Sequence, residues 1–451
     1  MKDNGKRKDE FYGRLSGLVF PIAFQQFMLS LVGASDAVML GSLSQDALSA
    51  VSLAGQVMFV FNLFLAALTI GASMFAAQYW GKKDKDTVER ILAFVLRFSL
   101  IISAVFFAGS ELFPESLMRI FTPDERLISP GADYLRAVGI SCLFCGASQI
   151  YLCIMKNTGH AGKSTLISSF AVVLNILLNA VFIFGLFKMP AMGITGAALA
   201  TVTARGAELL WAVAFSLREG RVRLRGKYVL LRDRELENTF WKYTLPVLGN
   251  ELVWGCGFTM YSVIMGHMGS DAVAANSIAN IVKNLVVCFC LGVGSGGGII
   301  VGNELGAGRE ALAREYGGRL CKISVISGII SGLFILAISP LILRFSSLSA
   351  EALHYLKWML IMCSGYLVGK SVNSTTIGGI FCAGGDSRFG LLCDAITLWV
   401  IVIPLGCLAA FILKWPVPAV YFVLNLDEII KLPAVYRHYK KYIWVKDLTT
   451  L

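Results

Sequence analysis

The chain has 451 residues, of which 56% are hydrophobic and only 15% are charged. About 25% of the residues of a typical soluble domain are charged, so this composition excludes an ordinary water-soluble protein. The formal net charge of +11 comes from cations that stand in short segments between long apolar runs. Orientation in a membrane explains such cations better than nucleic-acid binding does, so we expect a membrane protein that binds no nucleic acid.

Twelve apolar segments follow one another along the chain. Runs of about 20 apolar residues match the hydrocarbon core of a bilayer, which is roughly 30 Å thick. Backbone in lipid must form its hydrogen bonds internally, and the segments lack the period-two alternation of a membrane barrel. The predicted fold class is therefore an all-α membrane protein with twelve transmembrane helices. The predicted spans are 15–41, 48–80, 89–110, 133–156, 164–187, 192–217, 240–267, 273–303, 312–340, 352–380, 388–413 and 417–437.

Lysine and arginine residues predict the orientation of these spans. They cluster at 82–90, 218–234, 309–322 and 437–446, and the hydrophilic residues 1–14 are interpreted as a retained tail, not a signal peptide. Connections rich in Lys and Arg stay on the cytoplasmic side of a membrane. An even number of spans places both ends of the chain together, so we expect a multi-pass protein of the cell (plasma) membrane with both termini in the cytoplasm.

The two halves of the chain resemble each other. A shift of 225 residues aligns Pro21 with Pro246 and Gly41 with Gly266, and a shift of 223 aligns the GKS at 162–164 with the GDS at 385–387. Repeats that form a site between them are a recurring plan of transporters. The predicted organisation is a cytoplasmic tail (1–14), an N-terminal six-helix lobe (15–217), a basic linker (218–239), a C-terminal six-helix lobe (240–437) and a second tail (438–451).

Several ionisable side chains lie inside the predicted spans, where a charge is costly and marks a candidate functional site. Asp36 and Glu251 occupy the first and seventh spans, and Asp394 occupies the eleventh. The candidate cations are Lys283 in the eighth span and Lys370 in the tenth. The alternative for each is a paired structural charge or a position near the membrane surface. That alternative is favoured for Arg205 and Glu208, which stand three apart in the sixth span.

Two asparagines in the fifth span point to a cation site. Asn175 and Asn179 are four residues apart and share one helix face, and Thr201 in the sixth span could join them. Their side-chain oxygens could help to ligate a monovalent cation, or the amides could serve only as hydrogen bonds between helices.

Prolines stand at equivalent places near the start of each half. Pro21 and Pro246 each remove a hydrogen bond from a predicted span, which allows a bend. Such a pair could act as hinges for alternating access or form fixed kinks.

The sequence contains fragments of soluble-enzyme motifs, but each lacks a residue or a structural context that the motif requires. A GxGxxG pattern begins at Gly292, but no strand precedes it, so close helix packing is the better interpretation. The GKS at 162–164 lacks the leading glycine of a P-loop, and the CxxC of Cys142 and Cys145 lacks partner ligands. We predict that the protein is not an enzyme and has no organic cofactor.

Four motifs give the chain its resemblance to a known family. They are GNELGAG at 302–308, AQYWG at 77–81, AGGDS at 383–387 and MGITGAA at 192–198. Together with the twelve-span repeat they resemble the multidrug and toxic compound extrusion (MATE) transporters over nearly the whole chain. The resemblance implies two pseudo-symmetric six-helix lobes, V-shaped around a central cavity, that export organic cations or drugs in exchange for Na⁺ or H⁺.

The resemblance also assigns residues. Asp36 falls on the first-span aspartate of the family, Asn175 on the fifth-span asparagine of its cation site, and Glu251 on the seventh-span glutamate. Asn179 and Asn373 stand where many or some members have aspartate, which leaves the site short of carboxylates. Asp394 is a candidate for the missing charge.

The predicted ion-coupling set is therefore Asp36, Asn175, Asn179, Thr201, Glu251 and Asp394, with Na⁺ expected at the first four. The predicted substrate cavity includes Asp36, Glu251, Asn373 and Lys283. Loading the carboxylates with Na⁺ or H⁺ would release a small organic-cation or amphipathic substrate from a protein that acts as a monomer.

Three alternatives remain open. A lipid or lipid-linked oligosaccharide flippase of the same superfamily would favour a cationic cavity, and Lys283 and Lys370 give this alternative modest support. A receptor or channel would not need the repeat or the paired prolines. A membrane-embedded enzyme lacks a catalytic set in this sequence.

Overall fold

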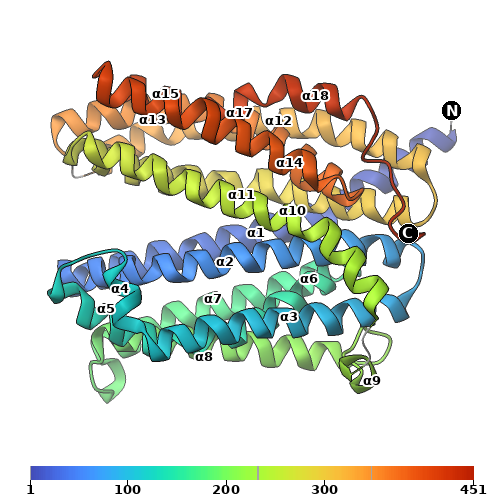
Figure 1. Ribbon diagram of the computed structural model, residues 1–451, viewed down its shortest axis with the longest axis horizontal. Helices are drawn as coiled ribbons and strands as arrows, with labels where there is room; N and C mark the ends of the chain where they lie inside the picture. Colours follow the sequence, from blue (N-terminus) through green and yellow to red (C-terminus); the bar gives the residue numbers. More distant parts are fainter. Residues whose placement is uncertain (1, 231–232, 347, 451) are drawn as a thin grey trace. The chain divides into compact units, whose positions relative to one another are not determined.

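The computed structural model describes residues 2–230, 233–346 and 348–450, and helices make up nearly all of them (Figure 1). The first half contains α1 (Lys2–Leu43), α2 (Gln45–Gly81), α3 (Lys85–Leu112), α4 (Pro114–Arg119), α5 (Glu125–Gly139), α6 (Ser141–Asn157), α7 (Ala161–Phe184), the 3-10 helix η1 (Leu186–Lys188), α8 (Gly193–Ser216) and α9 (Gly226–Leu230). The second half contains α10 (Arg234–His267), α11 (Ser270–Gly306), α12 (Glu310–Phe345), α13 (Ala350–Asn373), η2 (Ser374–Phe381), α14 (Ser387–Asp394), η3 (Ala395–Val402), α15 (Ile403–Cys407), η4 (Leu408–Ile412), α16 (Val417–Leu424), α17 (Asp427–Ile430) and α18 (Leu432–Tyr439).

Each of the twelve predicted spans falls on helix. Among the described residues, eight helices are long and apolar enough to cross a membrane, and the pair α5 and α6, bent by 46°, makes a ninth if it counts as one span. The other three predicted spans are α10, the stretch from α13 through η2, and the run α16 to α18, and each carries charged side chains. The prediction of an all-α membrane protein is confirmed.

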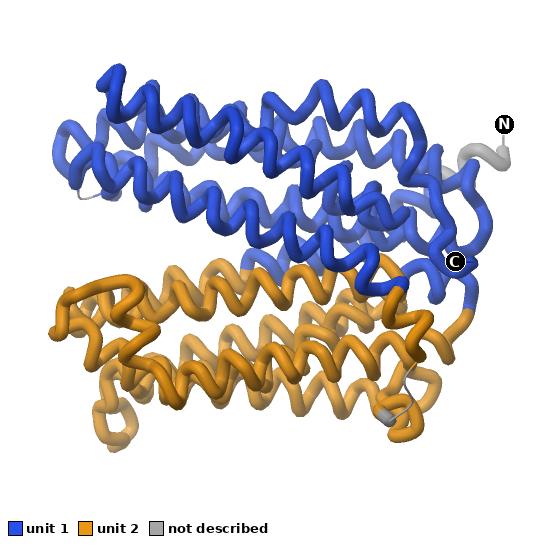
Figure 2. The backbone as a smooth tube through the Cα atoms, viewed as in Figure 1, with its two compact units in different colours: residues 1–27, 77–83, 239–451 blue, residues 28–76, 84–238 orange. Residues whose placement is uncertain are grey.

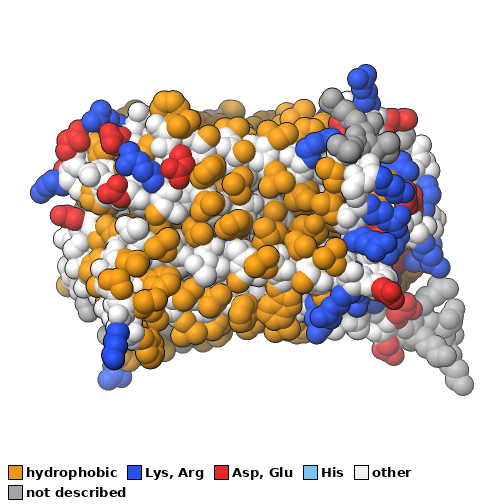
Figure 3. Space-filling view, turned by 90° about the horizontal axis from the view of Figure 1, so that it is seen from below, with side chains coloured by type: hydrophobic (Ala, Val, Ile, Leu, Met, Phe, Trp, Pro, Cys, Tyr) orange, Lys and Arg blue, Asp and Glu red, His pale blue; other side chains and the backbone are white. Residues whose placement is uncertain are grey.

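The surface has the character expected of a protein that faces lipid. Figure 3 shows hydrophobic side chains spread over the middle of one face, with Lys and Arg toward its ends. Large apolar side chains are well exposed, for example Leu210 at 74% and Leu333 at 60%. In water such exposure would be costly, whereas in a bilayer it costs nothing because the acyl chains are equally apolar.

The chain forms two compact units (Figure 2). Unit 1 comprises residues 1–27, 77–83 and 239–451, and unit 2 comprises residues 28–76 and 84–238. The helices α1 and α2 each contribute residues to both units. The lobe boundaries predicted from the sequence stay a prediction.

Glycines allow the helices of unit 1 to approach closely. A Cβ on Gly292 would lie 2.9 Å from the Val19 carbonyl oxygen, which confirms the packing interpretation of this glycine-rich span. A Cβ on Gly306 would overlap the backbone of Gln78, and one on Gly81 would overlap the backbone of Asn303. The GNELGAG and AQYWG motifs thus pack against each other through their backbones.

The basic linker of unit 2 packs against the start of α3. Arg225 forms an ion pair of 2.5 Å with Glu89, which is fully buried, and Arg90 lies 3.4 Å from Asp233. These contacts bring together two of the basic segments that the sequence assigns to one side of the membrane.

The C-terminal segment of unit 1 is also folded. Trp444 is fully buried, and its ring stacks on Tyr439 with 5.6 Å between centroids. All eleven cysteines of the chain are free thiols.

Three late spans of unit 1 depart from regular helix. The segments η2, η3 and η4 are π-helical, and η2 and η3 begin directly after Asn373 and Asp394. The twelfth span is divided into α16, α17 and α18. Turns of π-helix are rare and frequently accompany functional sites, so these spans are of interest for the chemistry of unit 1.

Candidate functional site

Unit 2 brings together four of the residues predicted to bind a cation. Asp36 comes from α1, Asn175 and Asn179 from α7, and Thr201 from α8. Asn179 Nδ2 donates to Asp36 Oδ1 at 2.6 Å and lies 3.3 Å from Asn175 Oδ1. Asn175 Nδ2 in turn donates to Thr201 Oγ1 at 3.2 Å. The spacing of four residues on α7 explains why both amides face the same neighbours.

One acceptor of this cluster remains unused. Asn179 Oδ1 is buried and has no hydrogen-bond partner among the described residues, and Asn179 itself is fully buried. A buried acceptor without a partner costs free energy, and a bound cation or water would satisfy it. The arrangement offers carboxylate, amide and hydroxyl oxygens, which are the ligands of hard cations.

Unit 2 also contains an ion pair between two side chains of the sixth span. Arg205 Nη1 lies 3.0 Å from Glu208 Oε2, which also accepts a hydrogen bond of 2.8 Å from Ser148. The pairing along one helix face that the spacing of three predicts is confirmed. Glu208 is fully buried, so its charge is compensated within the helix bundle of unit 2.

Unit 1 holds a larger charge cluster, centred on Lys431 in the twelfth span. Its ammonium lies 2.8 Å from Asp394 Oδ1, 3.5 Å from Glu428 Oε2 and 3.6 Å from Asp427 Oδ2. The Lys431 side chain is 3% exposed. Asp394, predicted as a coupling carboxylate, is thus paired with an internal cation.

Glu428 joins this cluster to the tenth span. Lys370 Nζ lies 3.0 Å from Glu428 Oε1, and Asn373 Nδ2 donates to Glu428 Oε2 at 2.7 Å. Asn373, predicted to line the substrate cavity, is 4% exposed and directs its amide at Glu428. Lys370 also lies 5.5 Å from the centre of the Trp254 ring, a cation–π distance.

Glu251 and Lys283, the remaining ionisable candidates of unit 1, form no direct ion pair with any described residue. Glu251 in α10 forms no salt bridge with any residue that the structure describes, although Lys370 and Asp394 act on it electrostatically. Lys283 in α11 is half-buried, and its ammonium lies 5.0 Å from the centre of the Tyr366 ring. Pro246 lies within α10, as Pro21 does within α1, and their role as hinges stays a prediction.

Three residues of the unit 1 cluster were missed from the sequence: Asp427, Glu428 and Lys431. The sequence does contain an indication of this cluster, because charged residues stand inside the last apolar segment and Lys431 follows Asp427 by four residues. The 223-residue shift between the halves places Glu428 on Arg205 and Lys431 on Glu208. The sixth and twelfth spans therefore carry an ion pair at equivalent positions with opposite polarity.

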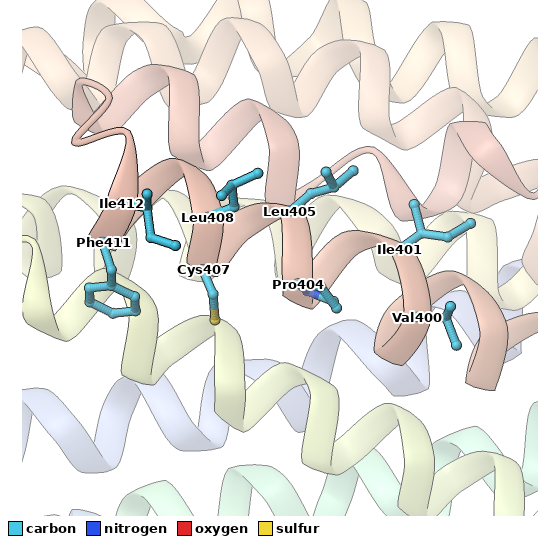
Figure 4. A pocket seen from close by; sticks show the side chains of 8 residues that line it. All are labelled: Val400, Ile401, Pro404, Leu405, Cys407, Leu408, Phe411 and Ile412. Carbon is cyan, nitrogen blue, oxygen red and sulfur yellow. The ribbon is translucent and has the colours of Figure 1, made fainter.

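An apolar groove lies along the eleventh span of unit 1, with a volume of about 490 Å³ (Figure 4). Its lining carries no charged side chain and consists of Val400, Ile401, Pro404, Leu405, Cys407, Leu408, Phe411 and Ile412. Such a lining suits acyl chains and offers nothing to a coupling ion.

The family model MatE matches the chain twice, over residues 21–181 and 246–408. The two matched segments begin at the equivalent prolines of the predicted repeat, which supports the 225-residue register.

Curated relatives match over nearly the full length. A Bacillus subtilis (strain 168) protein described as "Uncharacterized transporter YisQ" is 22% identical and covers 96% of this chain and 95% of its own. The "Probable multidrug resistance protein NorM" of Thermotoga maritima is 25% identical over 88% of this chain and 85% of its own. These relatives are described as a transporter and a multidrug resistance protein, not as enzymes.

Solved structures share the fold. An outward-facing multidrug resistance MATE family transporter of the MOP superfamily superimposes with a TM-score of 0.87 at 18% identity, covering 95% of both chains. A MOP superfamily transporter from Pyrococcus furiosus, described as having a binding pocket of reversed polarity, gives a TM-score of 0.87 at 17% identity over 97% of this chain and 96% of that one. The chain belongs to the MatE family, the multidrug and toxic compound extrusion transporters.

Proposed function

We propose that the protein is a secondary active antiporter that exports organic cations or drugs from the cytoplasm in exchange for Na⁺ or H⁺. The observation that carries the proposal is the contact of Asp36 with Asn179 in unit 2, beside an unused buried acceptor. An ionisable group within a spanning helix is a functional candidate by default. The family's multidrug resistance relatives support the substrate class.

The coupling would work through the charge of Asp36. Without an ion, the carboxylate holds a negative charge among apolar helices, with one amide hydrogen bond to offset it. Na⁺ or H⁺ would neutralise that charge. An ion shifts a conformational equilibrium only as far as its affinity differs between the two states. We therefore propose that the ion binds one facing state of the alternating-access cycle more tightly, and that Pro21 and Pro246 accommodate the change as hinges.

The same proposal covers the location, orientation, oligomeric state and partners of the protein. We place it in the cell membrane as a monomer with both termini in the cytoplasm, with Na⁺ or H⁺ in place of any organic cofactor and no nucleic-acid partner. The contacts of Arg225 with Glu89 and of Arg90 with Asp233 support one shared side for the basic segments. The lobes are proposed to begin and end at the boundaries given from the sequence.

Transport in proteoliposomes tests the proposal. The full chain is reconstituted with a panel of cationic dyes, and Na⁺ and pH gradients are imposed separately. We expect one gradient to drive dye movement, Asp36→Asn to abolish it, and Asp46→Asn, an exposed acid at the start of α2, to leave it unchanged. Gradient-driven dye movement that persists in Asp36→Asn would refute the assignment.

A lipid or lipid-linked oligosaccharide flippase is the second candidate function. The half-buried Lys283 beside Tyr366 favours it, because this ammonium forms no ion pair with any carboxylate that the structure describes and suits an anionic head group. The reversed pocket polarity described for the Pyrococcus furiosus transporter gives this alternative further weight. Flipping of a fluorescent anionic lipid, without movement of any dye, would favour the flippase.

A further inference from the structure

The twelfth span of unit 1 is discontinuous at a group of charges. The helix α16 ends at Leu424, α17 runs over Asp427–Ile430, and α18 begins at Leu432. Transporters commonly form their ion and substrate sites at interrupted helices, because the break frees backbone groups and brings helix ends to the site. Asp427, Glu428 and Lys431 lie at this break. The Lys431 carbonyl still accepts a hydrogen bond of 2.9 Å from the Val435 N–H, so the side chains and not freed backbone groups would hold a cation here.

The cation found there belongs to the chain itself. The Lys431 ammonium lies between 2.8 and 3.6 Å from one oxygen of each of three carboxylates, those of Asp394, Asp427 and Glu428. The exposed fractions of the three acidic side chains are 10%, 5% and 2%. Oxygen ligands from several carboxylates around one positive centre are also the arrangement that binds a hard metal cation. The Lys431 ammonium is therefore the positive centre that these three carboxylates share.

Tethering favours this ammonium over a competing ion. A group attached to the protein meets its site at a high effective concentration, whereas a free ion loses translational freedom when it binds. An external cation would also leave the Lys431 ammonium without its carboxylates, and an unpaired buried charge is costly. The second ammonium, that of Lys370 at 3.0 Å from Glu428, offsets a further negative charge.

The cluster has more acceptors than Lys431 and Lys370 use. Asp427 Oδ1 and Asn373 Oδ1 are buried without a hydrogen-bond partner among the described residues. An ammonium has three donors, and here its nearest oxygens belong to three different side chains. The unused oxygens would be available to a metal cation if the ammonium were removed.

We propose that Lys431 is a permanent internal cation that closes the acidic cluster of unit 1 to the coupling ion. Asp394, Asp427 and Glu428 then take no part in ion uptake, and Asp36 in unit 2 remains open to it. The inference rests on the proposed ion-coupled antiport. It makes Lys431 a residue that determines how many ions the protein binds.

Calorimetric Na⁺ titration of the purified full chain in detergent tests the inference. We expect Lys431→Ala to gain one saturable Na⁺ site relative to the wild type. The gain should persist in Asp36→Asn/Lys431→Ala and vanish in Asp427→Asn/Lys431→Ala. The matched control is Lys357→Ala, which changes an exposed lysine on α13 and should gain nothing. A folded Lys431→Ala that binds no more Na⁺ than the wild type overturns the inference.

A second measurement applies if Lys431→Ala does not fold. Asp36→Asn, which retains Lys431, is titrated alone and together with Asp427→Asn. We expect the two variants to bind the same amount of Na⁺, because the cluster is already filled. A saturable site in Asp36→Asn that disappears with Asp427→Asn would show that the cluster accepts free ions and would overturn the inference. Failure of the antiport proposal is distinct, because it appears as a wild-type protein that moves no dye under either gradient.

Discussion

The backbone N–H of Leu448 donates a hydrogen bond of 2.6 Å to the side-chain oxygen of Gln78, 370 positions earlier in the chain. The Gln78 amide donates to the carbonyls of Ala383 at 2.7 Å and Lys446 at 3.0 Å. One fully buried side chain therefore connects the end of α2, the segment before α14 and the C-terminal segment within unit 1.

Replacement of Gln78 by alanine should destabilise the protein. Gln78→Ala leaves the Leu448 N–H and the Ala383 carbonyl without their partner, and each buried group left unpaired costs about 1–3 kcal/mol. The measurement is the thermal unfolding midpoint in detergent. Gln56→Ala, at an exposed position of α2, is the control and should leave the midpoint nearly unchanged. Equal midpoints for both variants would contradict the assigned role.

The Asn179 side chain should control the affinity for the coupling ion. Asn179→Asp places a second carboxylate beside Asp36, and a cation between two carboxylates relieves their repulsion. We expect half-maximal dye transport at a lower concentration of the coupling ion. Asn179→Leu, of similar size, removes both the donor to Asp36 and the unused acceptor and should abolish coupling. Unchanged ion dependence in both variants would refute a role for Asn179.

The pair of Arg205 and Glu208 should behave as a structural unit. Arg205→Met leaves the buried Glu208 carboxylate without its cation, and breaking a buried pair from one side costs about 3–5 kcal/mol. The double variant Arg205→Met/Glu208→Leu should recover most of that loss. Thermal unfolding is measured for the wild type, Arg205→Met, Glu208→Leu and the double variant, which together form a double-mutant cycle. Additive losses in the double variant would show that the two charges are independent.

Gly306 should tolerate no side chain. A Cβ at this position overlaps the backbone of Gln78, which cannot move aside as a flexible side chain does. Overpacking of this kind costs typically about 1–3 kcal/mol. We expect Gly306→Ala to lower the unfolding midpoint and the yield of folded protein. The control is Gly17→Ala, because a Cβ on Gly17 meets nothing within 4 Å. A Gly306→Ala protein as stable as Gly17→Ala would contradict the close contact.

The spans and the shared helix face of Asn175 and Asn179 could be predicted from the sequence because they depend on local spacing, and the repeat could be predicted because motifs recur 225 residues apart. Long apolar runs identify spans, and the four-residue interval between Asn175 and Asn179 places two amides on one face of α7. Asp36 was a candidate as an ionisable side chain in the first predicted span, and the family resemblance matched it to the first-span aspartate of the family. The structure brings its carboxylate to Asn179.

The unit 1 cluster could not be predicted in the same way. Lys431 and Asp394 are 37 positions apart, on different spans, and only the fold brings them to 2.8 Å. Charges and Pro433 mark the break in the twelfth span, whereas the π-helical turns of η2 and η3 lie in segments whose apolar composition resembles that of ordinary spans. Backbone departures of this kind are decided by packing between helices and not by local propensity.

The opposite polarity of the pairs Arg205–Glu208 and Glu428–Lys431 has a consequence for how the two halves diverged. If both halves descend from one duplicated six-helix ancestor, the signs at these two positions were exchanged in one copy. A single exchange would have put two like charges side by side in a bilayer, where one central charge alone costs about 2.5–3.5 kcal/mol. The exchange must therefore have passed through uncharged residues or through paired substitutions. Homologues should accordingly show either order of signs, or neutral residues at both positions, and avoid two charges of the same sign.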